Sequence, residues 1–123
     1  MPRYAILTHD HPFPHWDFLL EDGESCRTWR LRSAPDSNGE IVAERLPDHR
    51  LLYLTYEGPV SGNRGSVSLW DTGTFEWITD DSREVKVKLS GRILNGIVRV
   101  TCVSDGSLRW TLHEGDPCMA PDH

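Results

Sequence analysis

The segment comprising residues 8–21 concentrates metal-binding side chains more densely than any other part of this sequence. It places five of them between two apolar runs: His9, Asp10, His11, His15 and Asp17. Side chains of a β-strand alternate between its two faces, so a strand that begins at His15 would put His15 and Asp17 on one face. Two imidazoles and one carboxylate make a mixed nitrogen and oxygen site suited to Mn²⁺, Fe²⁺ or Zn²⁺.

The third ligand of such a site would come from across a loop. His9 is separated from His15 by five residues, a distance that lets its ring return beside the strand. His11 stands two residues from His9 and competes with it as a ligand. In the alternative interpretation, these histidines lie on an exposed loop without binding a metal, and Asp17 caps a turn. This alternative stays open because only some clusters of this kind are functional sites.

A second polar pair, His49 and Tyr53, lies far away in the sequence, around a predicted strand at residues 50–56. A histidine can hold a phosphoryl oxygen or protonate a leaving oxygen, and a tyrosine hydroxyl can donate a hydrogen bond to the same group. Alternatively, Tyr53 simply packs in the wall of a sheet, as aromatic side chains commonly do.

Arginines recur in the middle third of the chain. Arg30 and Arg32 share one face of the strand predicted at residues 26–32, and Arg45 follows them. A guanidinium can grip two phosphate oxygens at once, so these side chains are candidates for phosphate binding. They fit equally well on the solvated outer face of an edge strand.

Short alternating or apolar runs predict about nine strands with turn signals every 8–12 residues and little helical periodicity. Residues 41–46 fit either a strand or one helical turn. Asp71 to Gly73 and Asn95-Gly96 look like hairpin turns. This pattern is typical of an all-β fold, and periodicity alone leaves an antiparallel sandwich and a barrel open.

Composition and length indicate that this chain of 123 residues contains one domain. The domain is expected at residues 1–114, followed by a loose polar tail at residues 115–123. We expect no membrane span or signal peptide, because no apolar run is long enough. Cys26, Cys102 and Cys118 form no C-x-x-C pair and favour reduced thiols in a cytoplasmic protein. The net charge of −6 confines any nucleic-acid binding to a local patch or an end.

Three segments together resemble a known family. They are His9-x5-His15-Trp16-Asp17-Phe18-x-Leu20-Glu21, then Asp48-His49-x3-Tyr53-x2-Tyr56-Glu57-Gly58, then Trp70-Asp71-x-Gly73-Thr74-Phe75-Glu76. This pattern, with Trp29 between the first two, resembles the 3′-phosphoesterase domain of bacterial DNA ligase D and its free-standing relatives. The resemblance implies a small antiparallel β-barrel of about eight or nine strands with little helix, formed by residues 1–114.

The resemblance also implies an activity and a site. The family removes a 3′-terminal ribonucleoside and then the 3′-phosphate in DNA end repair and non-homologous end joining. It uses a divalent metal, for which Mn²⁺ is expected and Zn²⁺ or Co²⁺ are alternatives. The metal ligands correspond to His9, His15 and Asp17, and the catalytic residues to His9, His49 and Tyr53. The expected partners are nucleic-acid 3′ ends, with a ligase and a polymerase as separate proteins.

The sequence departs from the family at two positions that bear on phosphate binding. Leu19 stands where the family carries an arginine, and Ser33 where it carries a lysine. The candidates to replace these charges are Arg30, Arg32, Arg50 and Arg64. Arg45 is a further phosphate-binding candidate, because it lies near the place of an upstream family arginine that has no clean match. The alternative function is that of a catalytically weak or inactive relative that binds metal or a nucleic-acid end without turnover.

Overall fold

The structure, a computed structural model, describes residues 1–37 and 39–114 and confirms the all-β prediction. Its strands are β1 (Arg3–His9), β2 (His15–Asp22), β3 (Ser25–Leu31), β4 (Ile41–Arg50), β5 (Gly58–Pro59), β6 (Ser66–Asp80), β7 (Glu84–Gly91), β8 (Asn95–Cys102) and β9 (Leu108–Glu114). The described residues contain no α-helix, only one turn of 3₁₀-helix, η1 (Leu51–Leu54).

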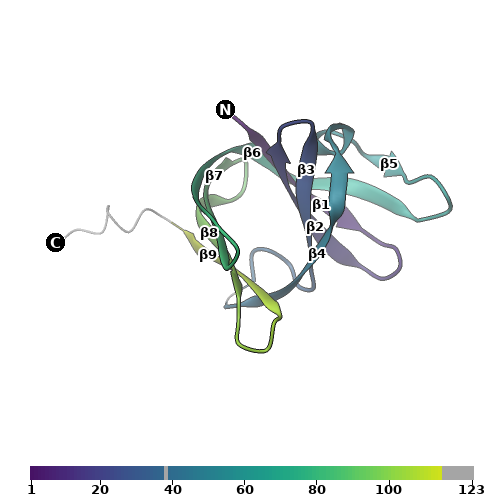
Figure 1. Cartoon of the computed structure of the whole chain (residues 1–123). Coiled ribbons are helices and arrows are strands. Elements are labelled where there is room, and N and C mark those ends of the chain that lie inside the picture. Colours follow the sequence, from purple (N-terminus) through teal and green to yellow (C-terminus); the bar gives the residue numbers. More distant parts are fainter. Residues whose placement is uncertain (38, 115–123) are drawn as a thin grey trace.

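The strands form a closed antiparallel barrel (Figure 1). Their order is β1-β2-β3-β4-β9-β8-β7-β6, and a further pairing of β1 with β6 closes the ring. β5 pairs with β6 outside this ring. The closed ring therefore selects the barrel over the sandwich that periodicity had left open.

Two apolar clusters lie on opposite sides of the barrel wall. The larger one fills the interior with residues from eight strands, among them Phe18, Phe75 and Trp110. The smaller one lies outside the wall, where η1 covers β1 and β2, and it includes Leu19 and Leu54. Alternation along β2 therefore points Phe18 into the barrel and leaves Asp17 and Leu19 on the outer, covered face.

The strand predicted at residues 50–56 is wrong. β4 instead runs from Ile41 to Arg50, which settles the ambiguous segment at residues 41–46 as a strand, and η1 follows it. The run after Arg50 is rich in leucine but does not alternate. Leu54 is buried against the outer wall while Leu52 is 47% exposed. A single helical turn achieves this arrangement where a strand would not.

The hairpin predicted at Asp71 to Gly73 is also wrong, because β6 runs unbroken from Ser66 to Asp80. Asp71 is fully buried, and its carboxylate accepts hydrogen bonds from the Tyr4 hydroxyl and from the backbone N–H groups of Ile93 and Leu94. Gly73 marks a close strand contact, since a Cβ there would lie 2.2 Å from the Ser90 carbonyl oxygen.

The turn predicted at Asn95-Gly96 lies three residues earlier, at residues 92–94 between β7 and β8. β8 begins at Asn95, and the Gly91 N–H donates to the Leu94 carbonyl at 2.9 Å across the actual turn. The carboxylate of Asp71 fixes this turn from the neighbouring strand. No helix within the described residues has both the length and the hydropathy to span a membrane. The predicted tail at residues 115–123 lies outside the described residues.

Candidate functional site

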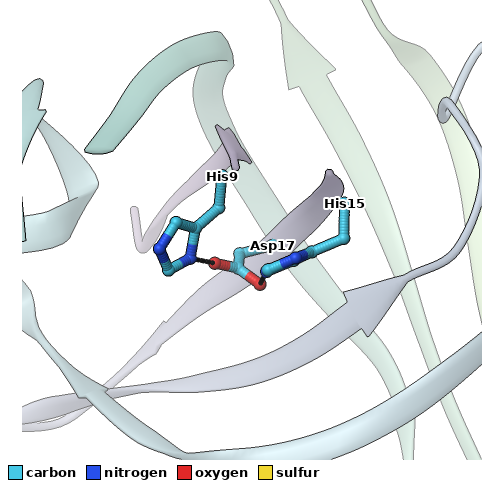
Figure 2. A group of neighbouring side chains, drawn as sticks. All are labelled: His9, His15 and Asp17. Atoms are coloured by element: carbon cyan, nitrogen blue, oxygen red, sulfur yellow. Dashed lines mark hydrogen bonds and ion pairs between the residues drawn. The ribbon is translucent and has the colours of Figure 1, made fainter. Parts of the chain in front are cut away.

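The end of β1 and the start of β2 bring the three predicted metal ligands together (Figure 2). His9 and His15 are direct partners in the β1–β2 register, so both rings emerge on the same face, 4.9 Å apart. Asp17 follows on that face two residues later. One ligand atom from each side chain lies within 4.8 Å of the others. His11 is exposed and is not part of this group.

Backbone carbonyls fix which nitrogen of each imidazole carries hydrogen. His15 Nδ1 lies 2.8 Å from the Phe13 carbonyl oxygen, and His9 Nε2 lies 2.9 Å from the Arg64 carbonyl oxygen. A carbonyl only accepts, so both of these nitrogens donate. The lone pairs of neutral rings are then left on His9 Nδ1 and His15 Nε2.

Both lone pairs face the carboxylate of Asp17. His9 Nδ1 is 3.3 Å from Asp17 Oδ2, a hydrogen bond when that nitrogen carries a proton, and His15 Nε2 is 3.1 Å from Asp17 Oδ1. His15 Nε2 and Asp17 Oδ1 are buried and have no hydrogen-bond partner. A buried carboxylate that faces imidazole nitrogens needs either a proton on an imidazole or a metal cation between them, because unpaired polar atoms there are costly.

A divalent metal fits this arrangement. Ligand atoms about 2.1 Å from a shared ion lie roughly 3 Å apart when they subtend a right angle. Backbone carbonyls that hold the remote nitrogen of a ligating histidine are the usual outer support of such sites. The three residues can therefore hold a metal, with coordination positions left for other ligands.

The second predicted pair, His49 and Tyr53, lines the same pocket, which has a volume of about 470 Å³. β4 carries His49 to the pocket and η1 carries Tyr53. The two rings pack edge to face with their centroids 5.8 Å apart. Tyr53 packs in the same way against Tyr56, with a centroid distance of 5.5 Å. His49 Nδ1 lies 3.1 Å from the Pro47 carbonyl oxygen, which leaves Nε2 for an external partner.

The three predicted phosphate-binding arginines lie in different places. Arg30 lines the pocket, because it is the direct strand partner of Asp17 and projects on the same face. Arg32 is an ion-pair partner of Glu44 at 2.8 Å and is not among the lining residues. Arg45 also lies outside that lining.

Arg45 is instead committed to local contacts. Its guanidinium donates to the Thr28 carbonyl oxygen at 3.1 Å and to Asp48 Oδ1 at 3.0 Å, and it lies over the Trp29 ring. The hydrogen bond from Arg45 is the main reason that the pKa of Asp48 lies below its ordinary value.

Arg50 and Arg64 complete the cationic lining of the pocket. Together with Arg30 they make this region locally basic in a chain whose net charge is −6. The sequence analysis did not identify the role of the Arg64 carbonyl as the partner of His9. The sequence does contain a signal for this contact, the glycine-rich run at residues 58–65. A Cβ at Gly65 would clash with Asp10 Oδ1, so glycine is required where the two segments approach each other.

Gly65 thus lets the β5–β6 loop pack directly on the loop that follows His9. The backbone N–H of Ser66 donates to Asp10 Oδ1 at 2.9 Å and fastens the two loops together. Gly65 also has φ +74°, a left-handed conformation that favours glycine. The loop geometry therefore contributes to the orientation of the His9 ring.

Leu19, the position at which the resemblance expects an arginine, is fully buried beneath η1. It packs in the outer cluster with Cys26 and Leu54 and does not line the pocket. Ser33 is exposed just beyond the end of β3. Neither position supplies a charge to the site.

Two comparisons with known proteins found similar sequences. The family described as "DNA Ligase D 3′-phosphoesterase domain" matches residues 7–101. The chain is also similar to the multifunctional non-homologous end joining protein LigD of Pseudomonas aeruginosa, with 32% identity over 87 residues. That match covers 67% of this chain and 10% of the relative, so the chain spans about a tenth of the relative's length.

Proposed function

This chain belongs to the DNA ligase D 3′-phosphoesterase family, and on that premise we propose that it is a metal-dependent phosphoesterase acting on 3′ ends of nucleic acid. The observation that carries the proposal is the pair of imidazole nitrogens directed at the carboxylate of Asp17. They lie in the same pocket as His49, Tyr53 and Arg30. Metal ligands and groups suited to a phosphoryl oxygen therefore share one cavity.

The chemistry divides between the two halves of the pocket. A divalent ion held by His9, His15 and Asp17 would polarise a phosphoryl oxygen and promote ionisation of water. Arg30 would bind phosphoryl oxygens through its guanidinium, which stabilises the charge that builds up in the transition state. The Tyr53 hydroxyl would donate a hydrogen bond to the same group.

His49 is placed to move a proton. Because Nδ1 donates to the Pro47 carbonyl, the free Nε2 is the atom that would donate to a phosphoryl oxygen or to the leaving oxygen. Outside the pocket the chain offers little to a duplex, since its net charge is −6. Binding confined to the terminal nucleotide fits this distribution of charge.

We propose 3′-phosphate and 3′-terminal ribonucleoside ends as substrates, and Mn²⁺ as the metal, with Zn²⁺ and Co²⁺ as alternatives of similar ligand preference. The name of the Pseudomonas relative refers to non-homologous end joining. We accordingly propose end joining in the cytoplasm as the setting, with a ligase and a polymerase as partners at the same break.

The test is to incubate metal-free protein with Mn²⁺ and a primer-template that ends in a 3′-phosphate or a 3′-ribonucleotide. We expect release of phosphate or nucleoside that requires the metal and disappears in His9→Ala and His49→Ala. Absence of metal-dependent release from a preparation shown to hold metal would rule out these substrates.

The buried position of Leu19 favours a second candidate, a relative that binds metal or a nucleic-acid end without turnover. The loss of one charge-assisted contact to a transferring phosphoryl group costs about 3 kcal/mol of transition-state stabilisation. Binding of a 3′-phosphorylated oligonucleotide in Mn²⁺, without any product after prolonged incubation, would identify this second function.

A further inference from the structure

Arg30 stands in a row of alternating charge that crosses three strands of the outer wall. Asp17 on β2 is the register partner of Arg30 on β3, and Arg30 is in turn the partner of Glu44 on β4. Directly paired residues in neighbouring strands project on the same face. The guanidinium of Arg30 therefore has a carboxylate on either side.

Glu44 does not hold Arg30 tightly. Glu44 Oε1 forms an ion pair with Arg32 at 2.8 Å and a longer one with Arg30 at 3.8 Å, and neither contact has hydrogen-bond geometry. Arg30 Nε is buried and has no hydrogen-bond partner. The Nε of Arg27 on the same strand is also buried without a hydrogen-bond partner, but its terminal nitrogens bind both carboxylate oxygens of Asp80, at 3.0 and 2.7 Å. Arg30 thus retains donors that a ligand in the pocket can use.

The ring of Phe13 lies beneath both guanidinium groups. The Cζ atoms of Arg30 and Arg32 are 5.3 and 4.7 Å from its centroid, a distance typical of cation–π contacts. Phe13 belongs to the loop that joins His9 to His15, and its carbonyl holds the His15 ring. The ring and the metal ligands are therefore fixed by one segment.

We propose that Arg32 is a positioning residue that occupies Glu44 and so keeps the Arg30 guanidinium available to a phosphate group in the pocket. This inference rests on the proposed phosphoesterase function. Without Arg32, the 3.8 Å ion pair between Glu44 and Arg30 would shorten to a hydrogen-bonded ion pair. That ion pair would draw Arg30 away from the pocket.

Inorganic phosphate, titrated into protein loaded with diamagnetic Zn²⁺, tests the proposal through the NMR resonance of the Arg30 Nε–Hε group, which paramagnetic Mn²⁺ beside Asp17 would broaden. Phosphate should shift this resonance in the wild type. Arg32→Ala should weaken phosphate binding about tenfold, the size of a coupling between neighbouring charges. Arg32→Lys, which keeps the charge, should recover most of the affinity.

Removal of the competing carboxylate supplies the second arm. Glu44→Gln should bind phosphate roughly threefold more tightly than the wild type. The double variant with Arg32→Ala and Glu44→Gln should bind phosphate with an affinity within about twofold of that of Glu44→Gln alone. Arg99→Ala is the matched control, because Arg99 pairs with Glu84 on the distant β7–β8 face and should leave phosphate binding unchanged.

The outcomes separate this inference from the proposed function. An unshifted Arg30 resonance in the wild type, or an Arg32→Ala defect that Glu44→Gln does not rescue, would overturn the positioning role even if the enzyme turns over. The expected binding pattern without any turnover of 3′-phosphorylated DNA would support the role of Arg32 and count against the phosphoesterase proposal.

Discussion

Replacing Asp17 with asparagine distinguishes a metal site from a purely structural cluster. The two interpretations predict changes of opposite sign in the free energy of unfolding of the metal-free protein. In the metal-free wild type, the carboxylate faces two imidazole lone pairs at 3.3 and 3.1 Å. An asparagine amide can donate to one of these nitrogens and remove a buried acceptor–acceptor contact. Asp17→Asn should therefore be as stable as the metal-free wild type or more stable, while losing stabilisation by metal.

The magnitudes follow from the structure and from linkage. One added hydrogen bond contributes about 1 kcal/mol to the free energy of unfolding of the variant. In the wild type, a ligand at a hundred times its dissociation constant adds about 2.7 kcal/mol. For a domain of this size that corresponds to a rise in Tm of roughly 10 °C.

The assay is a calorimetric or fluorescence melt with chelator and with excess Mn²⁺. Asp48→Asn is the matched control, because Asp48 also lines the pocket but is paired with Arg45 and lies outside the ligand group. It should keep the Mn²⁺-dependent rise. A rise that survives in Asp17→Asn, or a wild type that Mn²⁺ does not stabilise at any concentration, would refute the reasoning.

Three further measurements address other parts of the molecule. His49→Ala should lower kcat about 10²- to 10³-fold in steady-state assays while keeping the Mn²⁺-dependent rise in Tm; loss of that rise would instead make His49 a ligand. Asp71→Ala should lower the free energy of unfolding by about 3–5 kcal/mol in urea, because it leaves two backbone N–H groups and the Tyr4 hydroxyl without their acceptor; a loss below 1 kcal/mol would contradict this account. Burial raises the pKa of the Cys26 thiol to about 11, so iodoacetamide at pH 8 should alkylate the exposed Cys102 before Cys26. Peptide mapping that found equal labelling at Cys26 in folded protein would disprove its burial.

The grouping of the three candidate metal ligands could be predicted from the sequence because its geometry is local. Alternation along β2 places His15 and Asp17 on one face, and the five-residue loop returns the chain to pair His9 with His15. Nothing distant is needed to bring these three side chains together. The roles of the Phe13 and Arg64 carbonyls were not visible, because backbone atoms leave no signature in residue types.

His49 and Tyr53 lie side by side as expected, although the secondary structure predicted for residues 50–56 was wrong. Residues 50–56 were expected to be a strand, and Tyr53 instead lies on η1. A single helical turn after β4 returns Tyr53 beside His49, at a ring distance of 5.8 Å. The spacing of four residues allows both conformations to place the rings together, so the pairing did not depend on the secondary structure.

Turns were mispredicted where a distant residue overrides the local signal. The Asp71-Thr72-Gly73 run has the composition of a turn, but Asp71 is buried and binds the turn between β7 and β8. That contact also shifts the hairpin away from Asn95-Gly96. A buried carboxylate with three donors contributes more to stability than the preference of a dipeptide, and only the closed barrel reveals those donors.

The arginines required the full topology. Arg30, Arg32 and Arg45 look equivalent in the sequence, whereas the strand register makes Arg30 the direct neighbour of Asp17 and the other two engage carboxylates outside the pocket. Leu19 is paired with Thr28 beneath η1 and is fully buried there, so a charge at this position would have no solvent. In this barrel β3 therefore places an arginine as the direct strand neighbour of Asp17, although the arginine expected on β2 is absent.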